Sequence, residues 1–408
     1  MKFGLLYELQ LPRPWGADAE YKLVQNALEQ IEVADRFGAT SVWAVEHHFL
    51  EEYAHSSAPE VFLAAASQRT KNIRLGHGIV ALPPAMNPTY RVAERIGMLD
   101  LVSGGRVEFG TGETSSNAEI DAFHVPRDQK RPMWREALEV VARMMVEEPF
   151  QGHNGKYIQA PVRNVIPKPR QKPHPPLWVA CSQLEMIRVA AKLGIGALTF
   201  GFVSPEEARQ YTEEYYRIIE TECEPVGYTV NANIAFTMFY LCDRDGDRAR
   251  QIGRDGAGFF FHSFGHHYLF GEHEPGRTSI YNNYRASGGA PAPTGQDGFG
   301  TPDEIREYLR QWEDTGVDQI LLLAQNGNVP HEAICSSHEL FFKDVAPEYH
   351  EREEKRQKEK AARLAPAIER ALKRKKPVEP PKEKTVVRAY GKFGIFSVEG
   401  TATPPKSA

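Results

Sequence analysis

Short apolar runs of strand length alternate with longer segments of helical periodicity along most of the chain. The runs are rich in β-branched and aromatic residues, and the longer segments place apolar residues three and four positions apart. This pattern predicts eight strands, at Phe3–Tyr7, Ser41–Glu46, Ile73–Leu82, Arg106–Gly110, Leu177–Ala180, Ala197–Phe200, Asn233–Leu241 and Gln319–Ala324. It predicts eight helices, at 18–37, 59–69, 88–103, 134–145, 186–193, 205–219, 303–315 and 332–345.

Eight strand–helix repeats in one domain predict an α/β fold, a (β/α)8 TIM barrel of parallel strands. An open doubly wound sheet is the rival, but it would more often carry a glycine fingerprint after the first strand, which this sequence lacks. Insertions follow predicted strands 4 and 7. The first, at 150–175, is rich in proline and is predicted as a loop. The second, about residues 244–300, is rich in aromatic residues and ends in glycines and prolines. Long insertions are usually lids, binding loops or disordered segments, and we interpret this one as a lid that covers a site.

The composition is that of a globular protein with a large core. The 408 residues are 41% hydrophobic and 25% charged. The net charge of −5 gives no indication of nucleic-acid binding. The four cysteines are far apart, and no apolar run reaches the roughly 20 residues of a membrane helix. We expect a cytoplasmic protein with no membrane partner. The barrel domain is predicted over 1–349. It is followed by a charged, partly disordered tail over 350–408, predicted as a solvated helix and then a mobile extension.

One predicted strand ends abruptly in three ionisable residues, Glu46, His47 and His48. Buried ionisable groups need partners or water. In parallel α/β proteins, polar side chains at the carboxyl ends of strands face the ligand crevice. The stretch therefore favours a strand that delivers a carboxylate and two imidazoles to a site. The alternative is a loop with two solvated histidines.

A series of short motifs occurs in fixed order over the first 112 residues. They are Lys2-Phe3-Gly4, Val42 to Phe49, Leu82-Pro83, Asn87-Pro88, Ala93-Glu94, Leu99-Asp100, Ser103 to Arg106 and Phe109 to Gly112. Each is weak alone, but the ordered series resembles the bacterial luciferase-like flavin-dependent monooxygenases. The resemblance extends from Met1 to about Val345 and leaves the tail outside.

This resemblance implies a β/α barrel that binds FMN, as FMNH2, at the carboxyl ends of its strands. A separate NAD(P)H-flavin reductase would supply the FMNH2, O2 would be the co-substrate, and a C4a-peroxyflavin would oxidise a small organic molecule. Such chemistry requires excluded water and controlled protons. The family also implies a homodimer or a higher homo-oligomer.

The resemblance assigns roles to individual residues. His47 matches the catalytic histidine, with Glu46 and His48 as the neighbours that orient or charge it. Because strand residues alternate, Glu46 and His48 should point the same way and His47 the other. Gly78-Ile79 matches a non-prolyl cis peptide beneath the flavin ring, and Thr111 and Gly112 let the ring approach the backbone.

Other positions match the phosphate end of the flavin and the substrate side. Arg131 offers a fork suited to phosphate, while Ala180 and Ser182 stand at the family's phosphate loop, before a predicted helix. Glu113 replaces a family arginine and would face substrate. Phe259, Phe261 and His262 are predicted lid residues. No metal is expected, because His262, His266 and His267 fit no firm zinc spacing.

Two other functions are open at this point. The first is a deazaflavin (F420)-dependent hydride-transfer oxidoreductase on the same barrel, whose members tend to have Asp-His where this chain has Glu-His-His. The second is a non-enzymatic flavin-binding protein. An intact Glu-His-His and an aromatic lid favour an enzyme, because storage requires no proton donor.

Overall fold

The computed structural model describes residues 1–200, 203–289, 297–375 and 385–387. Eight parallel strand positions form a closed barrel, in which β1 pairs with both β2 and β12. In order around the barrel they are β1 (Lys2–Tyr7), β2 (Ser41–Ala44), β3 (Arg74–His77) continued by β4 (Val80–Ala81), β5 (Val107–Gly112), β8 (Leu177–Cys181), β9 (Gly196–Thr199), β10 (Ile234–Cys242) and β12 (Gln319–Leu323). The predicted (β/α)8 barrel is confirmed.

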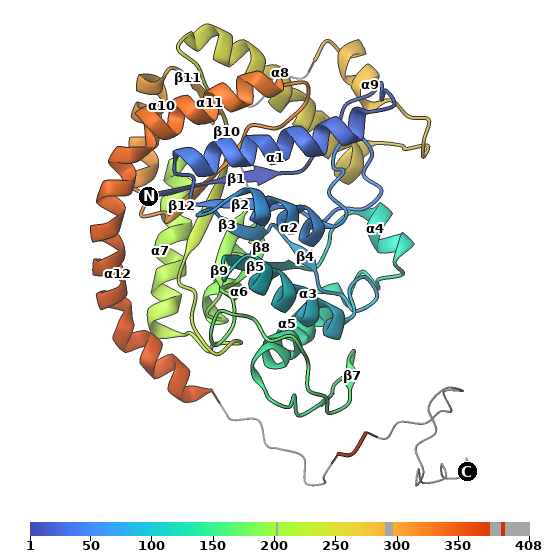
Figure 1. Ribbon diagram of the computed structural model, residues 1–408, viewed down its shortest axis with the longest axis vertical. Coiled ribbons are helices and arrows are strands. Elements are labelled where there is room, and N and C mark those ends of the chain that lie inside the picture. The colour runs from blue at the N-terminus through green and yellow to red at the C-terminus, as the bar shows by residue number, and fades with distance from the viewer. Residues whose placement is uncertain (201–202, 290–296, 376–384, 388–408) are drawn as a thin grey trace.

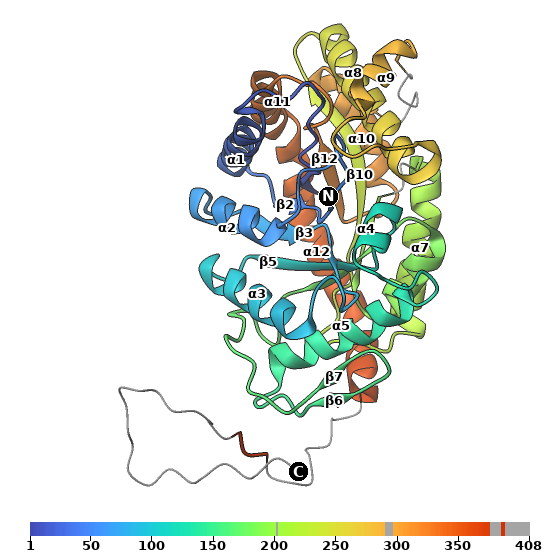
Figure 2. The ribbon, with the colours of Figure 1, turned by 90° about the vertical axis from the view of Figure 1, so that its right-hand side faces the viewer.

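Helices surround the barrel (Figures 1 and 2). They are α1 (Ala19–Phe37), α2 (Pro59–Arg69), α3 (Thr89–Val102), α4 (Asn117–Ala122), α5 (Lys130–Val146), α6 (Leu184–Lys192), α7 (Pro205–Thr221), α10 (Pro302–Glu313) and α11 (His331–Asp344). Capping boxes begin α7 at Ser204 and α10 at Thr301, and each has proline in its first turn. Within the described ranges, no helix is long and apolar enough to cross a membrane.

Alternate strand residues face the barrel interior and the helix layer. Trp43 on β2 and Trp178 on β8 meet across the interior, with ring centroids 5.3 Å apart. Gly76 on β3 makes room for them, because a Cβ there would collide with the Trp43 indole. His77, the next residue, is fully buried on the opposite face, near Phe109 and under α2 and α3. It therefore points away from the barrel mouth.

The two insertions lie at opposite ends of the molecule (Figure 1). The first, predicted as a loop, contains a small antiparallel hairpin of β6 (His153–Asn154) and β7 (Gln159–Ala160). The second is largely helical, with α8 (Gly246–Gly265), the π-helix η1 (His266–Phe270) and α9 (Ile280–Ala286). It returns through β11 (Asp297–Gly300), which pairs in parallel with β10. Part of its Gly/Pro-rich end, residues 290–296, lies outside the described residues.

A long last helix, α12 (Ala346–Arg374), crosses the boundary predicted near residue 349. It runs along the barrel beside α7 and buries Tyr349, Leu364 and Ala371 (Figure 1). The charged sequence from 350 to 375 is thus the solvated face of a docked amphipathic helix. The predicted disorder concerns residues that, apart from 385–387, lie outside the described ranges.

Candidate active site

The candidate site is built around His47, which follows β2. Its backbone N–H donates to the Ser56 carbonyl at 2.9 Å, which closes the loop between these two residues. Its Nδ1 lies 3.0 Å from Glu119 Oε1, and its Nε2 lies 3.8 Å from Glu8 Oε2. The two carboxylates hold the imidazole in place. One fifth of the His47 side chain is exposed, so the ring is still open to a ligand.

The Glu119 carboxylate on α4 organises this corner. It also accepts from the Thr114 hydroxyl at 2.7 Å and from the His48 backbone N–H at 2.8 Å. Burial raises the pKa of Glu119, but these donors and His47 outweigh it and hold its pKa below the usual range. Burial lowers the pKa of His47, but the carboxylates of Glu119, Glu8 and Glu46 outweigh it, and the net shift is upward. His47 therefore favours its protonated form.

Glu46 and His48 form a second pair beside the first. The two side chains meet at 3.2 Å, between His48 Nε2 and Glu46 Oε1, which confirms that they point the same way. Glu46 also accepts from the Ala81 backbone N–H at 3.0 Å and from Asn87 Nδ2 at 2.7 Å. These bonds tie the end of β2 to β4 and leave Glu46 in a supporting position.

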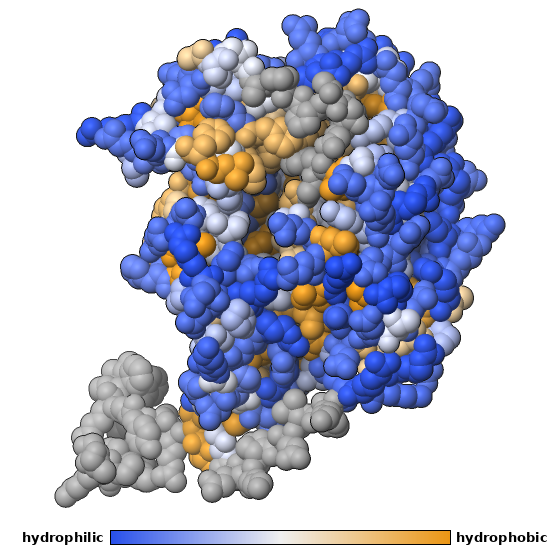
Figure 3. Space-filling view, turned by 180° about the vertical axis from the view of Figure 1, so that it is seen from behind, coloured by the Kyte–Doolittle hydropathy of each residue, from blue (hydrophilic) through white to orange (hydrophobic). Residues whose placement is uncertain are grey.

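Aromatic residues cover His47 on one side. Tyr53 lies 5.8 Å from the imidazole between ring centroids and donates to Glu8 Oε1 at 3.4 Å. Tyr268, from η1 in the second insertion, lies 6.4 Å from the same ring and stacks on Phe264. The insertion thus reaches the His47 cluster. On the face opposite to Figure 1, the surface is hollowed near its centre, and apolar side chains line the hollow (Figure 3).

The predicted flavin-ring residues come together at β4 and β5. Ile79 packs against Gly112, where a Cβ would collide with its side chain, and Ala81 pairs with Gly112 in the sheet. Thr111 points the other way, because its hydroxyl donates to the Trp178 carbonyl and accepts from Trp134 Nε1. Its side chain is therefore engaged in the helix layer.

The expected cis peptide at Gly78–Ile79 is wrong. The cis peptide bonds of the described residues all precede proline, at Pro14, Pro149, Pro167 and Pro173. A non-prolyl cis bond costs about 3–4 kcal/mol and needs surroundings that enforce it. The interruption between β3 and β4 instead has a Gly78 N–H that donates to the Ala44 carbonyl at 2.7 Å.

The predicted phosphate residues also lie together, but with carboxylates among them. Arg131 at the start of α5 donates to Glu113 Oε1 at 3.2 Å and to Glu185 Oε1 at 2.7 Å. Glu185 is in the first turn of α6, which follows the exposed Ser182 at the end of β8. Ala180, on β8, is half-buried. Arg131 and Ser182 thus flank one helix start, and Glu113 faces Arg131.

The predicted lid residues are divided between two clusters. Phe259 is buried with Ile280 and Tyr284 in a small core between α8 and α9. His262 contacts Tyr284 on the same side. Phe261 packs against Phe239 on β10, with ring centroids 5.3 Å apart. Of these three, Phe261 alone packs against a barrel strand, and Tyr268 is the insertion residue that reaches His47.

Three residues of the cluster escaped prediction: Glu8, Tyr53 and Glu119. Tyr268 belongs to the aromatic insertion that was predicted to be a lid. Glu8 directly follows a predicted strand, which is the signal that drew attention to Glu46. Glu119 lies 72 positions from its partner His47, on a short helix that was not predicted. Nothing local in the sequence links those two residues.

The buried Glu8 carboxyl gives a pH-dependent stability prediction. Burial raises the pKa of Glu8 from 4.5 to about 6. Between these two pH values the folded protein therefore keeps a proton that the unfolded chain releases. The stability this group contributes is therefore present below pH 4.5 and lost as the pH rises to about 6. We expect Glu8→Gln, which cannot ionise, to exceed the native protein in stability at pH 8 by about 1–2 kcal/mol and to match it near pH 4.

Urea unfolding at both pH values measures this difference. Glu213→Gln, on an exposed position of α7, is the control and should give the same small change at both pH values. A Glu8→Gln effect that does not depend on pH would contradict the assignment.

Comparison with known proteins places this chain in a family. A family model described as luciferase-like monooxygenase matches residues 1–319. The chain therefore belongs to the luciferase-like monooxygenases, a family that the order of its motifs had indicated.

Curated relatives match parts of the chain. It is 32% identical over 190 residues to 4-hydroxyprotoasukamycin monooxygenase of Streptomyces nodosus subsp. asukaensis, covering 46% of this chain and 50% of that one. It is 32% identical over 232 residues to limonene 1,2-monooxygenase of Rhodococcus erythropolis (53% and 55%). It is 29% identical over 185 residues to the oxygenase component of flavin-dependent trigonelline monooxygenase of Acinetobacter baylyi (44% and 49%). The chain spans about half the length of the curated relatives it matches.

Solved structures match nearly the whole barrel. Monooxygenase RslO1 from Streptomyces bottropensis has a TM-score of 0.71 and 26% identity, covering 86% of this chain and all of that one. The oxygenating constituent of 3,6-diketocamphane monooxygenase from Pseudomonas putida, in complex with FMN, has a TM-score of 0.67 at 20% identity (85% and 98%). An F420-dependent secondary alcohol dehydrogenase has a TM-score of 0.62 at 18% identity (84% and 98%). The last two likenesses concern the fold alone.

Proposed function

We propose that this protein is an FMNH2-dependent monooxygenase that uses O2 to oxidise a small organic substrate. The observation that carries the proposal is His47, a partly exposed imidazole held between Glu119 and Glu8 at the carboxyl ends of the barrel strands. A separate NAD(P)H-flavin reductase would supply the reduced flavin. One relative, trigonelline monooxygenase of Acinetobacter baylyi, has a separate oxygenase component, which supports that division of labour.

His47 would manage protons at the reacting centre. The Glu119 carboxylate accepts from Nδ1, so the second proton of the imidazolium sits on Nε2. The carboxylates that raise the pKa of His47 stabilise this protonated form, whose Nε2 proton would be transferred to a reacting oxygen. The Glu8 carboxyl, whose pKa burial raises to about 6, has its Oε2 3.8 Å from His47 Nε2 and would return a proton to that nitrogen after the transfer.

The bound flavin would supply the activation of O2. Gly78 and Gly112 offer backbone and Ile79 offers a small apolar side chain, and these three residues would contact the flavin ring. Ser182 and the first turn of α6 would accept the phosphate through a hydroxyl and free backbone N–H groups. Arg131 can join them only if its fork leaves Glu113 or Glu185.

The second insertion would act as a lid over this site. Tyr268 and Phe264 come from it, and both approach Tyr53 beside His47. A closed aromatic cover excludes water, which protects a reactive oxygen species from futile decay.

The deazaflavin-dependent oxidoreductase is the second candidate, because one solved neighbour on the same barrel uses F420. Anaerobic titration with reduced FMN and with reduced F420 separates the two functions. We expect reduced FMN to bind and the complex to consume O2 when a substrate is added. The substrates to offer are limonene, trigonelline and an N-acetyl-S-alkylcysteine, because relatives are monooxygenases of these three compounds. Tight binding of reduced F420 with hydride transfer and no O2 consumption would overturn the proposal.

Arg131 provides a test of the phosphate site. We expect Arg131→Ala to weaken FMN binding by about 1.5–3 kcal/mol and riboflavin binding much less, since riboflavin lacks the phosphate. Equilibrium titration of both ligands measures the difference. Arg188, an exposed arginine on α6 that pairs with Glu214, is the matched control. Equal weakening of FMN and riboflavin by Arg131→Ala would show that Arg131 does not contact the phosphate.

A further inference from the structure

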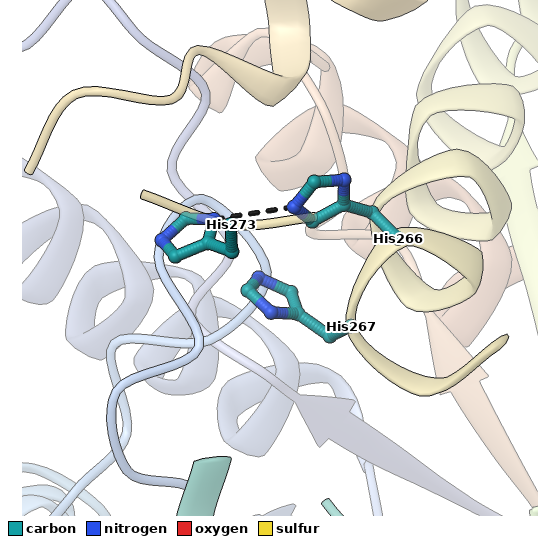
Figure 4. A group of neighbouring side chains, drawn as sticks. All are labelled: His266, His267 and His273. Carbon is teal, nitrogen blue, oxygen red and sulfur yellow. Dashed lines mark hydrogen bonds between the residues drawn. The ribbon is translucent and has the colours of Figure 1, made fainter. Parts of the chain in front are cut away.

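Three histidines gather outside the His47 site, at the junction of the insertion and the loop after β2. His266 and His267 begin η1, and His273 lies in the segment that follows. Their side chains point toward one another (Figure 4). Each offers one ring nitrogen, and the three nitrogens lie within 4.8 Å of one another.

The spacing within this cluster matches a shared metal ion. His266 Nε2 and His273 Nδ1 are 3.2 Å apart. Two nitrogens bound to one tetrahedral zinc at about 2.0–2.1 Å lie about 3.3 Å apart. Two neutral imidazoles can also form a hydrogen bond at this distance, so the third ring and its surroundings decide the interpretation.

Glu51, in the loop after β2, supplies those surroundings. Its carboxylate Oε1 lies 3.6 Å from His273 Nε2, the nitrogen opposite the one that faces His266. Its backbone carbonyl lies 2.9 Å from His267 Nε2. A carboxylate behind a histidine is the arrangement that orients metal-binding imidazoles. His273 Nε2 is buried and has no hydrogen-bond partner among the described residues.

The donor atoms of this cluster indicate which ions it would accept. Nitrogen donors with one nearby carboxylate select zinc and related ions over the oxygen-seeking Mg²⁺ and Ca²⁺.

We propose that His266, His267 and His273 bind one divalent transition-metal ion of the zinc type, with water in the remaining position and the Glu51 carboxylate orienting His273 from behind. The sequence had predicted no metal because His262 was grouped with His266 and His267. His262 instead contacts Tyr284 and Phe270, and His273 completes the cluster.

The position of this site gives the ion a structural role. Glu51 also accepts from the Gly276 backbone N–H at 2.8 Å and pairs with Arg13 at 2.6 Å. Its neighbour Glu52 accepts from the backbone N–H groups of Ile280 and Tyr281. A bound ion would therefore fasten the insertion to the loop that carries His47. This inference does not depend on the flavin or on the reaction.

Metal titration of the untagged full chain, stripped with a chelator, tests the proposal. We expect one equivalent of Zn²⁺ by calorimetry and elemental analysis, and visible absorption of tetrahedral type with Co²⁺. His267→Ala and His273→Ala should each weaken Zn²⁺ binding by more than about 100-fold. His262→Ala, a matched histidine on the preceding helix, should bind as the native protein does. The absence of stoichiometric binding, or equal binding by all variants, would overturn the proposal.

Hydrogen–deuterium exchange of the native protein gives a second test that needs no variant. Added Zn²⁺ should slow exchange in residues 266–276 and in the loop near Glu51, and a chelator should reverse the change. Exchange that Zn²⁺ leaves unaltered in both segments would also overturn the proposal. For the variants used in the metal titration, circular dichroism checks that a loss of Zn²⁺ binding does not result from unfolding.

Discussion

Replacing His47 by alanine should reduce product formation by about 10²–10⁴-fold, the contribution of a positioned general acid–base group. The imidazole is partly exposed, bound through Nδ1 to Glu119, and has a raised pKa, so its Nε2 is the available proton donor. Flavin affinity should change little, because the predicted ring and phosphate contacts come from other strands. Single-turnover oxidation by the pre-reduced enzyme measures the loss.

His48→Ala is the matched control for this prediction. His48 bonds to Glu46 rather than to Glu119 through its side chain, so its loss should affect stability more than turnover. The pH profile adds a readout that a purely structural role would not alter. The native rate should fall as the pH rises through the raised pKa of His47, and His47→Ala should lack that step. A large loss confined to His48→Ala would mean that the roles are reversed.

Asp318→Ala should cost about 3–5 kcal/mol of unfolding free energy, the largest stability effect that we expect from one substitution. Asp318, 1% exposed, precedes β12 at the end of the barrel opposite His47. It accepts from Lys360 Nζ at 2.7 Å, from Arg356 Nη2 at 3.1 Å and from the Ile234 backbone N–H at 2.9 Å. The Lys360 side chain is only 11% exposed, so removal of the Asp318 carboxylate leaves a nearly buried positive charge without its partner.

Denaturant unfolding followed by circular dichroism measures this change. Asp314→Ala, four residues earlier and exposed, is the control and should change stability by less than about 0.5 kcal/mol. Because Arg356 and Lys360 belong to α12, the variant should also expose that helix to limited proteolysis. A loss below about 1 kcal/mol would show that α12 docks independently of this network.

The barrel was predictable because local signals and the overall fold agree. Strand-length apolar runs such as Gln319–Leu323 are buried on both faces, and proline or capping residues begin helices where the structure has them. The residues after β2 were also predictable, since side chains such as Glu46, His47 and His48 that directly follow a parallel strand lie at the mouth of the barrel.

The remainder depends on contacts between distant parts of the chain. Glu119 meets His47 only after folding and is not marked by its neighbours in sequence, and Tyr268 was predicted only as one of several lid aromatics. Charge density alone predicted a solvated tail beyond 350, whereas buried partners such as Asp318 dock α12 onto the barrel. The geometry at Gly78–Ile79 was inferred from resemblance and was wrong, because local sequence does not determine which peptide bond isomerises.

The central claim is that reduced FMN and O2 act together at the His47 site to oxidise an organic molecule. Mass spectrometry of the product formed under isotopically labelled O2 tests it most directly, with a flavin reductase, NAD(P)H and the substrates named above. The account predicts one labelled oxygen atom in the product, and product formation that requires FMN and collapses in His47→Ala. An unlabelled product, or turnover that proceeds with F420 and without O2, would contradict it.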